Sequence, residues 1–563
     1  MHHYYTGEKN HQILISLLKQ HNIKNVIASP GVANSCLIGS IQDDPFFNII
    51  SAVDERSAAY IACGLSREKG EPVVLSCTGA TASREYMPAL TEAFYSKLPI
   101  LVVTSSQPSN RVGHLIAQVT DRSTPPSDVA KISVELPTVR NSDDEWQCTI
   151  SANKAILELF RHGGGPAHIN LITAYSYSEE VSLTHKELVS ARKIERYEAG
   201  SELPSISCGK VGIFVGSHAM WDDKLLSLVE DFCSKYNAVV FCDHTSNYYG
   251  KYKNFYPLSI NQACLAKERI PAYNLELCIH IGEVCGEEGA SSMIKSRETW
   301  RVSPDGEIRD YFRNLSKVFE MSELLFFKHY CDMGQVRENT FIKECDDKND
   351  SLKKVLNEQV DNIPMSNVWI AQKTAGLIPE KSCVTLSILN TLRTWNYAEF
   401  KNTVHVLCPT GGFGIDGIPS ISIGASLANT DKLSFCIVGD LAFFYDMNSL
   451  GNRFVGNNLR ILMVNNGCGV EFKKSYSLAY SLLGEDVNPY VAAKGHFGNK
   501  SPELVKHYAS DLGFKYICAS TKKEFEKNLP TFVSTESAES IVFEVFVSDA
   551  DEVEALNIVH NRK

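Results

Sequence analysis

The chain has 563 residues, more than a single hydrophobic core usually serves, so about three domains are expected. Apolar residues make up 44% of it and charged residues 21%, which is typical of globular proteins in water. The net charge of −11 argues against nucleic acid as the main partner.

The cysteines and the first residues indicate where the protein works. The 17 cysteines never occur as Cys-x-x-Cys, and several lie in apolar runs, as reduced core residues of cytosolic proteins do. The first residues are polar, unlike a signal peptide, and no apolar run approaches the roughly 20 residues that span a bilayer. We therefore expect a cytoplasmic protein with no membrane partner.

Strand-like and helix-like segments alternate along the first part of the chain. Strands are expected at residues 25–29, 47–53, 72–77, 99–105 and 167–171, and helices at 10–20, 55–69 and 83–96. Such alternation predicts an α/β fold with a parallel, doubly wound sheet. We assign this first domain to residues 1–180.

Polar and small residues follow the ends of these strands. Ser29 and Gly31 follow the first strand, and Glu55 opens the helix after the second. An acid in a first helical turn often does no more than complement the helix dipole. A carboxyl group shielded from water can also hold and release a proton during catalysis. Gln118, in a later loop, is a surface amide on the simplest interpretation.

A second α/β layer is expected over residues 195–335, with strands at 211–216, 238–242, 275–281 and 300–303 and a helix at 224–236. No Gly-x-Gly-x-x-Gly motif occurs near these strands, so we expect a structural role rather than nucleotide binding. Charged, mixed segments at residues 172–200 and 332–361 are interpreted as linkers. The last domain then covers residues 360–563.

Two strand-like runs of the last domain, residues 435–438 and 461–464, are each followed by an oxygen-bearing side chain. Asp440 follows the first run, and Asn466 follows the second. Ligands of open α/β sheets bind at this carboxyl edge. Mg²⁺ prefers hard oxygen ligands and shares them with phosphates. A carboxylate, an amide oxygen and the backbone carbonyl of Cys468 therefore suit a metal ion that holds a diphosphate.

The spacing of Gly-Asp, about 25 residues and Asn-Asn resembles the metal and diphosphate signature of thiamine-diphosphate-dependent enzymes. Residues 29–31, the segment from Glu55 and residues 78–81 are similar to the pyrimidine-binding domain of that family. Residues 414–417 and 439–448 look most like its menaquinone-pathway carboligase branch. The resemblance implies three α/β domains, namely a pyrimidine-binding, a middle and a diphosphate-binding domain.

The resemblance also implies cofactors, an assembly and residue roles. The cofactors would be thiamine diphosphate and Mg²⁺, in a homodimer or homotetramer whose active site is shared between subunits. Glu55 would activate the aminopyrimidine ring, Gln118 would face the substrate, and Ile415 would hold the cofactor in its bent shape. The cofactor-binding residues would be Ser29, Gly31, Gly414, Ile415, Gly439, Asp440, Leu441, Ala442 and Asn466, and the metal ligands Asp440, Asn466 and Cys468.

Departures from that branch bear on the substrate. The branch uses arginines to hold carboxylate-rich substrates, whereas this chain lacks three of them, one of them where Thr410 stands. Each lost partner of a buried carboxylate costs on the order of 2–3 kcal/mol. Arg393, Thr410 and Phe472 remain as expected substrate contacts. Glu471 adds an acid that favours a neutral or cationic second substrate.

We therefore expect decarboxylation of a 2-oxo acid, such as pyruvate, with transfer of the resulting acyl carbanion to a small-molecule acceptor. Three alternatives stay open: a simple 2-oxo acid decarboxylase, the menaquinone-pathway synthase itself, and a non-catalytic protein on the same fold. The presence of both Glu55 and the metal signature argues against the last of these.

Overall fold

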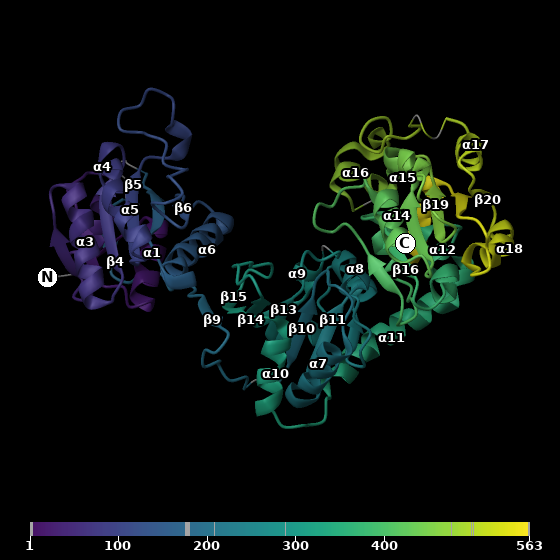
Figure 1. The fold of residues 1–563 in the computed structure, drawn as a ribbon, viewed down its shortest axis with the longest axis horizontal. Helices are drawn as coiled ribbons and strands as arrows, with labels where there is room; N and C mark the ends of the chain where they lie inside the picture. The colour runs from purple at the N-terminus through teal and green to yellow at the C-terminus, as the bar shows by residue number, and fades with distance from the viewer. Residues whose placement is uncertain are drawn as a thin grey trace. The chain divides into compact units, whose positions relative to one another are not determined.

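The computed structural model describes residues 4–174, 181–207, 209–287, 289–474, 476–496, 498 and 500–560. The chain forms two compact units, one made of Met1–Glu198 with Gly306–Val318 and the other of Ala199–Asp305 with Phe319–Lys563. Three large sheets, each flanked by helices, are visible in Figure 1. The expected α/β class with parallel sheets is thereby confirmed, while the domain boundaries remain predictions.

The first unit is built on a parallel sheet of six strands in the order β3-β2-β4-β5-β7-β6. Its strands are β2 (Asn25–Ala28), β3 (Asn48–Ser51), β4 (Val73–Thr78), β5 (Ile100–Ser106), β6 (Ser133–Leu136) and β7 (Ala167–Ile172). Its helices are α1 (Lys9–Gln20), α2 (Ser35–Ile41), α3 (Glu55–Lys69), α4 (Thr81–Glu85), α5 (Met87–Tyr95) and α6 (Ser142–Glu158). Helices α1 and α6 share one apolar core with the sheet and α3 and α5 share another, so the sheet is doubly wound.

Local signals explain where α3 begins and ends. The side chain of Asp54 accepts a hydrogen bond from the backbone N–H of Ser57 at 2.7 Å and so caps the first turn. Gly70 ends the helix with a φ of 65°, a conformation that glycine adopts without strain. The helix expected at 83–96 is instead two helices, α4 and α5, which meet at Tyr86.

The second unit contains the last sheet and five strands of the middle sheet. In the middle sheet, β12-β11-β10-β13-β14 run parallel within this unit. These strands are β10 (Val211–Val215), β11 (Ala238–Cys242), β12 (Lys253–Phe255), β13 (Asn274–Ile281) and β14 (Lys295–Ser303), and the accompanying helices are α7 (Asp223–Tyr236), α8 (Pro257–Ala266), α9 (Ala290–Met293) and α10 (Glu323–Met333). All five strands are largely buried, as parallel strands covered on both faces should be.

The last sheet is parallel, with the order β17-β16-β18-β19-β21-β20. Its strands are β16 (Cys383–Leu386), β17 (His405–Leu407), β18 (Ser434–Gly439), β19 (Leu459–Asn465), β20 (Lys515–Ala519) and β21 (Ile541–Phe546). Its helices are α12 (Asn367–Thr374), α13 (Asn390–Trp395), α14 (Ile418–Ala428), α15 (Asp440–Asp446), α16 (Leu478–Leu483), α17 (Leu504–Asp511), α18 (Lys522–Val533) and α19 (Asp549–Val559). Strand β18 lies between β16 and β19, so the carboxyl ends of these three strands are neighbours.

The interpretation of residues 332–361 as a linker is wrong. Helix α11 (Phe341–Gln359) occupies most of this segment. Phe341, Cys345 and Leu356 are buried along it, whereas many of its acidic and basic residues are exposed. The acid-rich composition therefore belongs to the solvent side of an amphipathic helix.

The other expected linker, residues 172–200, includes two short strands in its described part. These are β8 (Leu183–His185), which pairs antiparallel with β1 (Tyr5–Thr6), and β9 (Glu195–Glu198); residues 175–180 lie outside the described part. No helix within the described ranges is both long and apolar enough to cross a membrane.

Candidate functional site

The centre of the site in the second unit is Asp440, the first residue of α15, directly after β18. Its side chain is buried, and Oδ2 accepts a hydrogen bond from the backbone N–H of Gly467 at 2.7 Å. Nε2 of His496 lies 3.0 Å from the same oxygen. Oδ1 makes no hydrogen bond with any described residue. One oxygen of a well-oriented buried carboxylate therefore remains available to a cation.

The other two expected metal ligands lie on the turn after β19. The backbone N–H of Cys468 donates to Oδ1 of Asn466 at a long 3.3 Å, and Gly467 has a φ of 73°. The turn thus holds the amide oxygen of Asn466 and the carbonyl of Cys468 on either side of Gly467, whose N–H contacts Asp440. Carboxylate, amide and carbonyl oxygens form a donor set that suits Mg²⁺, so these residues fit the expected ion.

His496 was not anticipated from the sequence. It lies on the loop after α16, which reaches back to the metal-binding turn: the N–H of Gly495 donates to the carbonyl of Gly467 at 2.9 Å, and that of Gly469 donates to the carbonyl of Ala492 at 2.6 Å. The histidine ring also packs on Phe444, with ring centroids 5.5 Å apart. A contact across 56 residues leaves no local sequence signal.

Arg393, expected to contact substrate, is paired within the protein. It lies on α13, which follows β16, and its Nη1 donates to both carboxylate oxygens of Glu471 at 2.8 and 2.7 Å. Nζ of Lys474 donates to Oε2 of the same glutamate at 2.5 Å. Burial raises the pKa of Glu471, but the charges of Lys474 and Arg393 outweigh it and lower this pKa to about 2. Glu471 is therefore held as a carboxylate between two cations.

The remaining expected residues of this unit surround the same edge. A Cβ on Gly414 would lie 2.3 Å from Oδ1 of Asp416, an exposed side chain that would have to turn away. Ile415 is half-buried against the core that α14 and α15 share. Thr410 is buried, whereas Phe472 is 36% exposed. Gly439 caps α15, Ala442 is buried behind it, and Leu441 lies near Gly469.

In the first unit, Ser29 and Gly31 lie at the carboxyl edge of the sheet. A Cβ on Gly31 would come within 2.8 Å of Cβ of Thr78, so the backbone can approach closely only without a side chain. The hydroxyl groups of Ser29 and Tyr86 are buried and make no hydrogen bond within the described residues. Burial, with the neighbouring Cys77, raises the pKa of Tyr86. Both hydroxyl groups are closed to solvent, so a bound molecule could reach them only if the surrounding side chains moved.

Glu55 is the first residue of α3 and is half-buried. Its charge is a minor contribution to the raised pKa of Tyr86, after burial and Cys77. Gln118 lies on an exposed loop with a φ of 63° and makes no hydrogen bond with another described residue. Glu55 belongs to the first unit and Asp440 to the second, so neither unit alone contains both residues.

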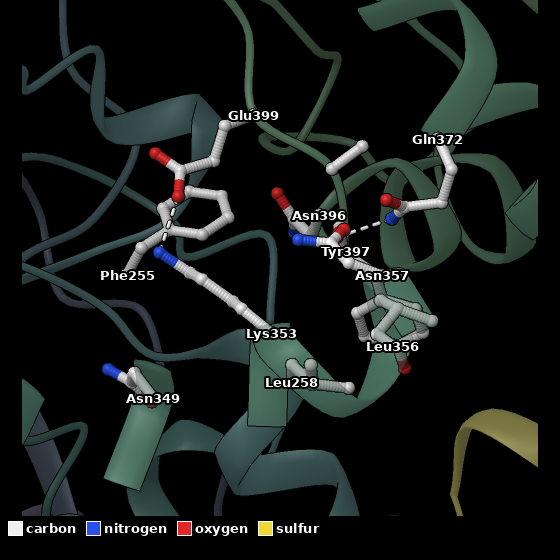
Figure 2. A pocket seen from close by; sticks show the side chains of 11 residues that line it. Phe255, Leu258, Asn349, Lys353, Leu356, Asn357, Gln372, Asn396, Tyr397 and Glu399 are labelled. Carbon is white, nitrogen blue, oxygen red and sulfur yellow. Dashed lines mark hydrogen bonds and ion pairs between the residues drawn. The ribbon is translucent and has the colours of Figure 1, made fainter. Parts of the chain in front are cut away.

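A separate cavity of about 140 Å³ lies in the second unit (Figure 2). It is lined by Phe255, Leu258, Asn349, Lys353, Leu356, Asn357, Gln372, Asn396, Tyr397, Ala398 and Glu399. Lys353 and Lys253 both bind Glu399, and the amide of Gln372 donates to the carbonyl of Tyr397 at 2.6 Å. None of the expected site residues lines this cavity. Along the chain, Arg393 precedes the lining residue Asn396 by three positions.

Comparison with known proteins supports the class that these residues indicate. Residues 9–125 match the family described as thiamine pyrophosphate enzyme, N-terminal TPP binding domain. This match confirms the resemblance to thiamine-diphosphate-dependent enzymes that the motifs indicated.

The relatives further indicate the branch. The chain is similar to proteins named 2-succinyl-5-enolpyruvyl-6-hydroxy-3-cyclohexene-1-carboxylate synthase. That of Bacteroides fragilis is 28% identical over 97% of both chains, that of Phocaeicola vulgatus 29% over 96% of both, and that of Flavobacterium johnsoniae 25% over 95% of both. The resemblance to this branch is therefore confirmed, and these relatives match nearly the whole chain.

Proposed function

We propose that the protein uses thiamine diphosphate and Mg²⁺ to decarboxylate a 2-oxo acid such as pyruvate and to transfer the remaining acyl group to a small-molecule acceptor. The observation that carries this proposal is the buried carboxylate of Asp440, oriented through Oδ2 with Oδ1 left open, beside the turn of Asn466. Thiamine diphosphate, when bound, supplies an electron sink for the charge left by the departing CO₂.

Each residue has a physical role in this proposal. Asp440, Asn466 and the carbonyl of Cys468 would hold the metal ion and through it the diphosphate. Glu55, which is half-buried, would hold and release the proton that activation of the aminopyrimidine ring requires. Gly31 would leave room for the cofactor beside Thr78, and Ile415 would restrict its bent shape.

The proposal includes an assembly in which two subunits share the site, as a homodimer or homotetramer located in the cytoplasm, with no nucleic acid or membrane partner. Val53, Tyr60 and Ile61 are exposed apolar residues on the same segment as Glu55. Exposed apolar side chains grouped beside a functional residue are typical of a surface that another protein surface covers. They support a second subunit at this edge of the first unit.

The name of the relatives favours a second candidate, the synthase of the menaquinone pathway. This alternative predicts turnover of 2-oxoglutarate with isochorismate. The pairing of Arg393 with Glu471 argues against it, because the guanidinium is already committed to an internal carboxylate. A simple decarboxylase would release aldehyde when no acceptor is present, and a non-catalytic protein would bind the cofactor without turnover.

The decisive experiment loads the protein with thiamine diphosphate and Mg²⁺, screens small 2-oxo acids for CO₂ release, and then screens acceptors by mass spectrometry. The Glu55→Gln variant should bind the cofactor but lose exchange of its C2 proton. Glu68→Gln, which changes an exposed acid near the end of the same helix, serves as the matched control and should keep exchange. Wild-type exchange in Glu55→Gln would refute the role given to Glu55.

A further inference from the structure

Every lysine and arginine in residues 390–395 and in the described part of 465–496 is paired with an acid of the protein. Arg393 and Lys474 bind Glu471, while Lys473 and Lys494 bind Asp549. These segments follow β16 and β19, which flank the strand that leads to Asp440. At this edge of the sheet, no cation of these described segments is left for an anionic substrate.

The pairing of Glu471 is tight and partly sealed from water. The side chains of Arg393 and Glu471 are 13% and 19% exposed, and that of Lys474 is 1% exposed. The carboxylate of Glu471 thus lies between two basic side chains that are largely shielded from water. Breaking one member out of such a cluster leaves the others buried and uncompensated, which is costly.

The cluster lies where a substrate would meet the protein. Arg393 lies on α13, which follows β16, and Glu471 lies on the segment after β19. These two strands flank β18, and ligands of open α/β sheets bind at this edge. Phe472, the residue after Glu471, presents a partly exposed apolar ring there. An uncharged group can pack on this surface, whereas a carboxylate would have to displace Glu471 from both of its partners.

We infer that Glu471 is a specificity-determining residue that makes the site accept a substrate with an uncharged end, that is, a 2-oxo acid without a second carboxylate. This inference rests on the proposed function. Glu471 binds both Arg393 and Lys474, so the second carboxylate of a dicarboxylic acid would have to compete with an internal carboxylate for these two side chains.

The test compares 2-oxoglutarate with 2-oxoglutaramate, which has the same chain length and an uncharged end. For the wild-type protein loaded with thiamine diphosphate and Mg²⁺, kcat/KM from CO₂ release should favour the amide by about tenfold or more. Glu471→Gln keeps the shape of the side chain and frees both cations, so it should shift the preference towards the dicarboxylic acid by a similar factor, mainly through KM.

Three controls make the result specific. Adding Arg393→Met to Glu471→Gln should abolish the gain, and Glu485→Gln, an acid of the same region that lies beside Lys473, should leave the preference unchanged. Calorimetric binding of both compounds in a Glu55→Gln background measures affinity without turnover. An unchanged substrate preference in a folded Glu471→Gln variant overturns the inference. A wild-type preference of about tenfold for 2-oxoglutarate also overturns it, and this measurement does not depend on whether the variant folds.

The two proposals fail in different ways. Absence of CO₂ from every 2-oxo acid, with cofactor bound, contradicts the proposed function, and the calorimetric comparison still decides the role of Glu471. Ready CO₂ release together with tight binding of 2-oxoglutarate to the wild type contradicts only the role of Glu471.

Discussion

Nε2 of His496 lies 3.0 Å from Oδ2 of Asp440, the carboxylate proposed to bind Mg²⁺. The same oxygen accepts a hydrogen bond from the backbone N–H of Gly467. Gly495, the residue before His496, donates its own N–H to the carbonyl of Gly467. The strand end, the metal-binding turn and the later loop therefore hold one another. This arrangement fixes the carboxylate before any ion binds.

Replacing Asp440 with Asn should remove the stabilisation that cofactor and metal confer. A ligand at about 100 times its Kd stabilises a folded protein by about 2.7 kcal/mol, and an amide cannot neutralise the bound cation. The thermal midpoint of the wild type should rise when thiamine diphosphate and Mg²⁺ are added together and fall back with a chelator. Asp440→Asn should show little of this shift.

The matched control for this experiment is Asp511→Asn, which changes an exposed acid at the end of α17. It should keep the full ligand-induced shift. His496→Asn should keep part of it, because the Gly467 N–H still orients Asp440. A full shift in Asp440→Asn would show that another group holds the metal ion.

Gly31→Ala should weaken cofactor binding and destabilise the first unit by about 1–3 kcal/mol, because the added methyl group would overlap Thr78. Gly64→Ala is the control: this glycine lies inside α3, and a Cβ there would meet nothing within 4 Å. Higher helix propensity should stabilise that variant by about 0.5–1 kcal/mol. Chemical denaturation with and without thiamine diphosphate measures both effects, and equal behaviour of the two variants would contradict the close approach at Gly31.

The sequence predicted the helices and strands best where local signals set their ends. The start of α3 follows from the capping side chain of Asp54, and its end follows from Gly70. Helix α11 was missed because its buried residues are sparse among acids and lysines, so its apolar stripe is narrow and its composition is that of a linker. The break at Tyr86 does have a sequence signal, Pro88, which is disfavoured inside a helix but tolerated in the first turn of α5.

The site residues, too, could be predicted where the signal is local and could not where the contact is distant in the sequence. Asp440 and Asn466 could be predicted because each directly follows a strand of the same sheet. The contact of His496 with Asp440 spans 56 residues, and the pairing of Arg393 with Glu471 spans 78. Such contacts depend on how loops pack over the sheet edge, and one sequence does not show this. The sequence shows Glu471 as an unusual acid, but it does not show that Arg393 and Lys474 bind it.

Asp549 should be a positioning residue for the loop that covers the metal site. Its Oδ2 accepts hydrogen bonds from Nζ of Lys473 at 2.5 Å and from Nζ of Lys494 at 2.8 Å. One lysine follows the metal-binding turn and the other lies on the covering loop. Asp549→Asn should raise the Mg²⁺ concentration needed for half-maximal cofactor-induced stabilisation several-fold and cost about 1–3 kcal/mol of stability.

Asp551→Asn, a change in the same first turn of α19, controls for helix capping in this experiment. Titration of Mg²⁺ at saturating thiamine diphosphate, followed by thermal midpoint, separates the two variants. If both shift the Mg²⁺ requirement equally, the effect comes from α19 and not from the lysine contacts.

Glu552 should make stability depend on pH. Its side chain is fully buried and accepts hydrogen bonds from the backbone and side chain of Asn367 at 3.0 and 2.9 Å. Burial raises its pKa from 4.5 to about 7. The folded protein thus binds this proton more tightly than the unfolded chain does. The resulting contribution to stability is complete below about pH 4.5 and is lost as the pH rises to about 7.

Glu552→Gln should remove that dependence, because the amide is neutral throughout this range. Oδ1 of Asn390, which is buried and makes no hydrogen bond with any described residue, can accept from the new amide after a flip. The variant should match the wild type near about pH 5 and exceed its free energy of unfolding by on the order of 2 kcal/mol near about pH 8. Urea denaturation at both pH values measures this difference. Glu554→Gln, an exposed acid two residues later, should follow the wild type. The contrary outcome is a wild-type stability that does not change with pH over this range and a Glu552→Gln variant that is no more stable at the higher pH. It would show that Glu552 is charged in the folded protein and balanced by Lys474.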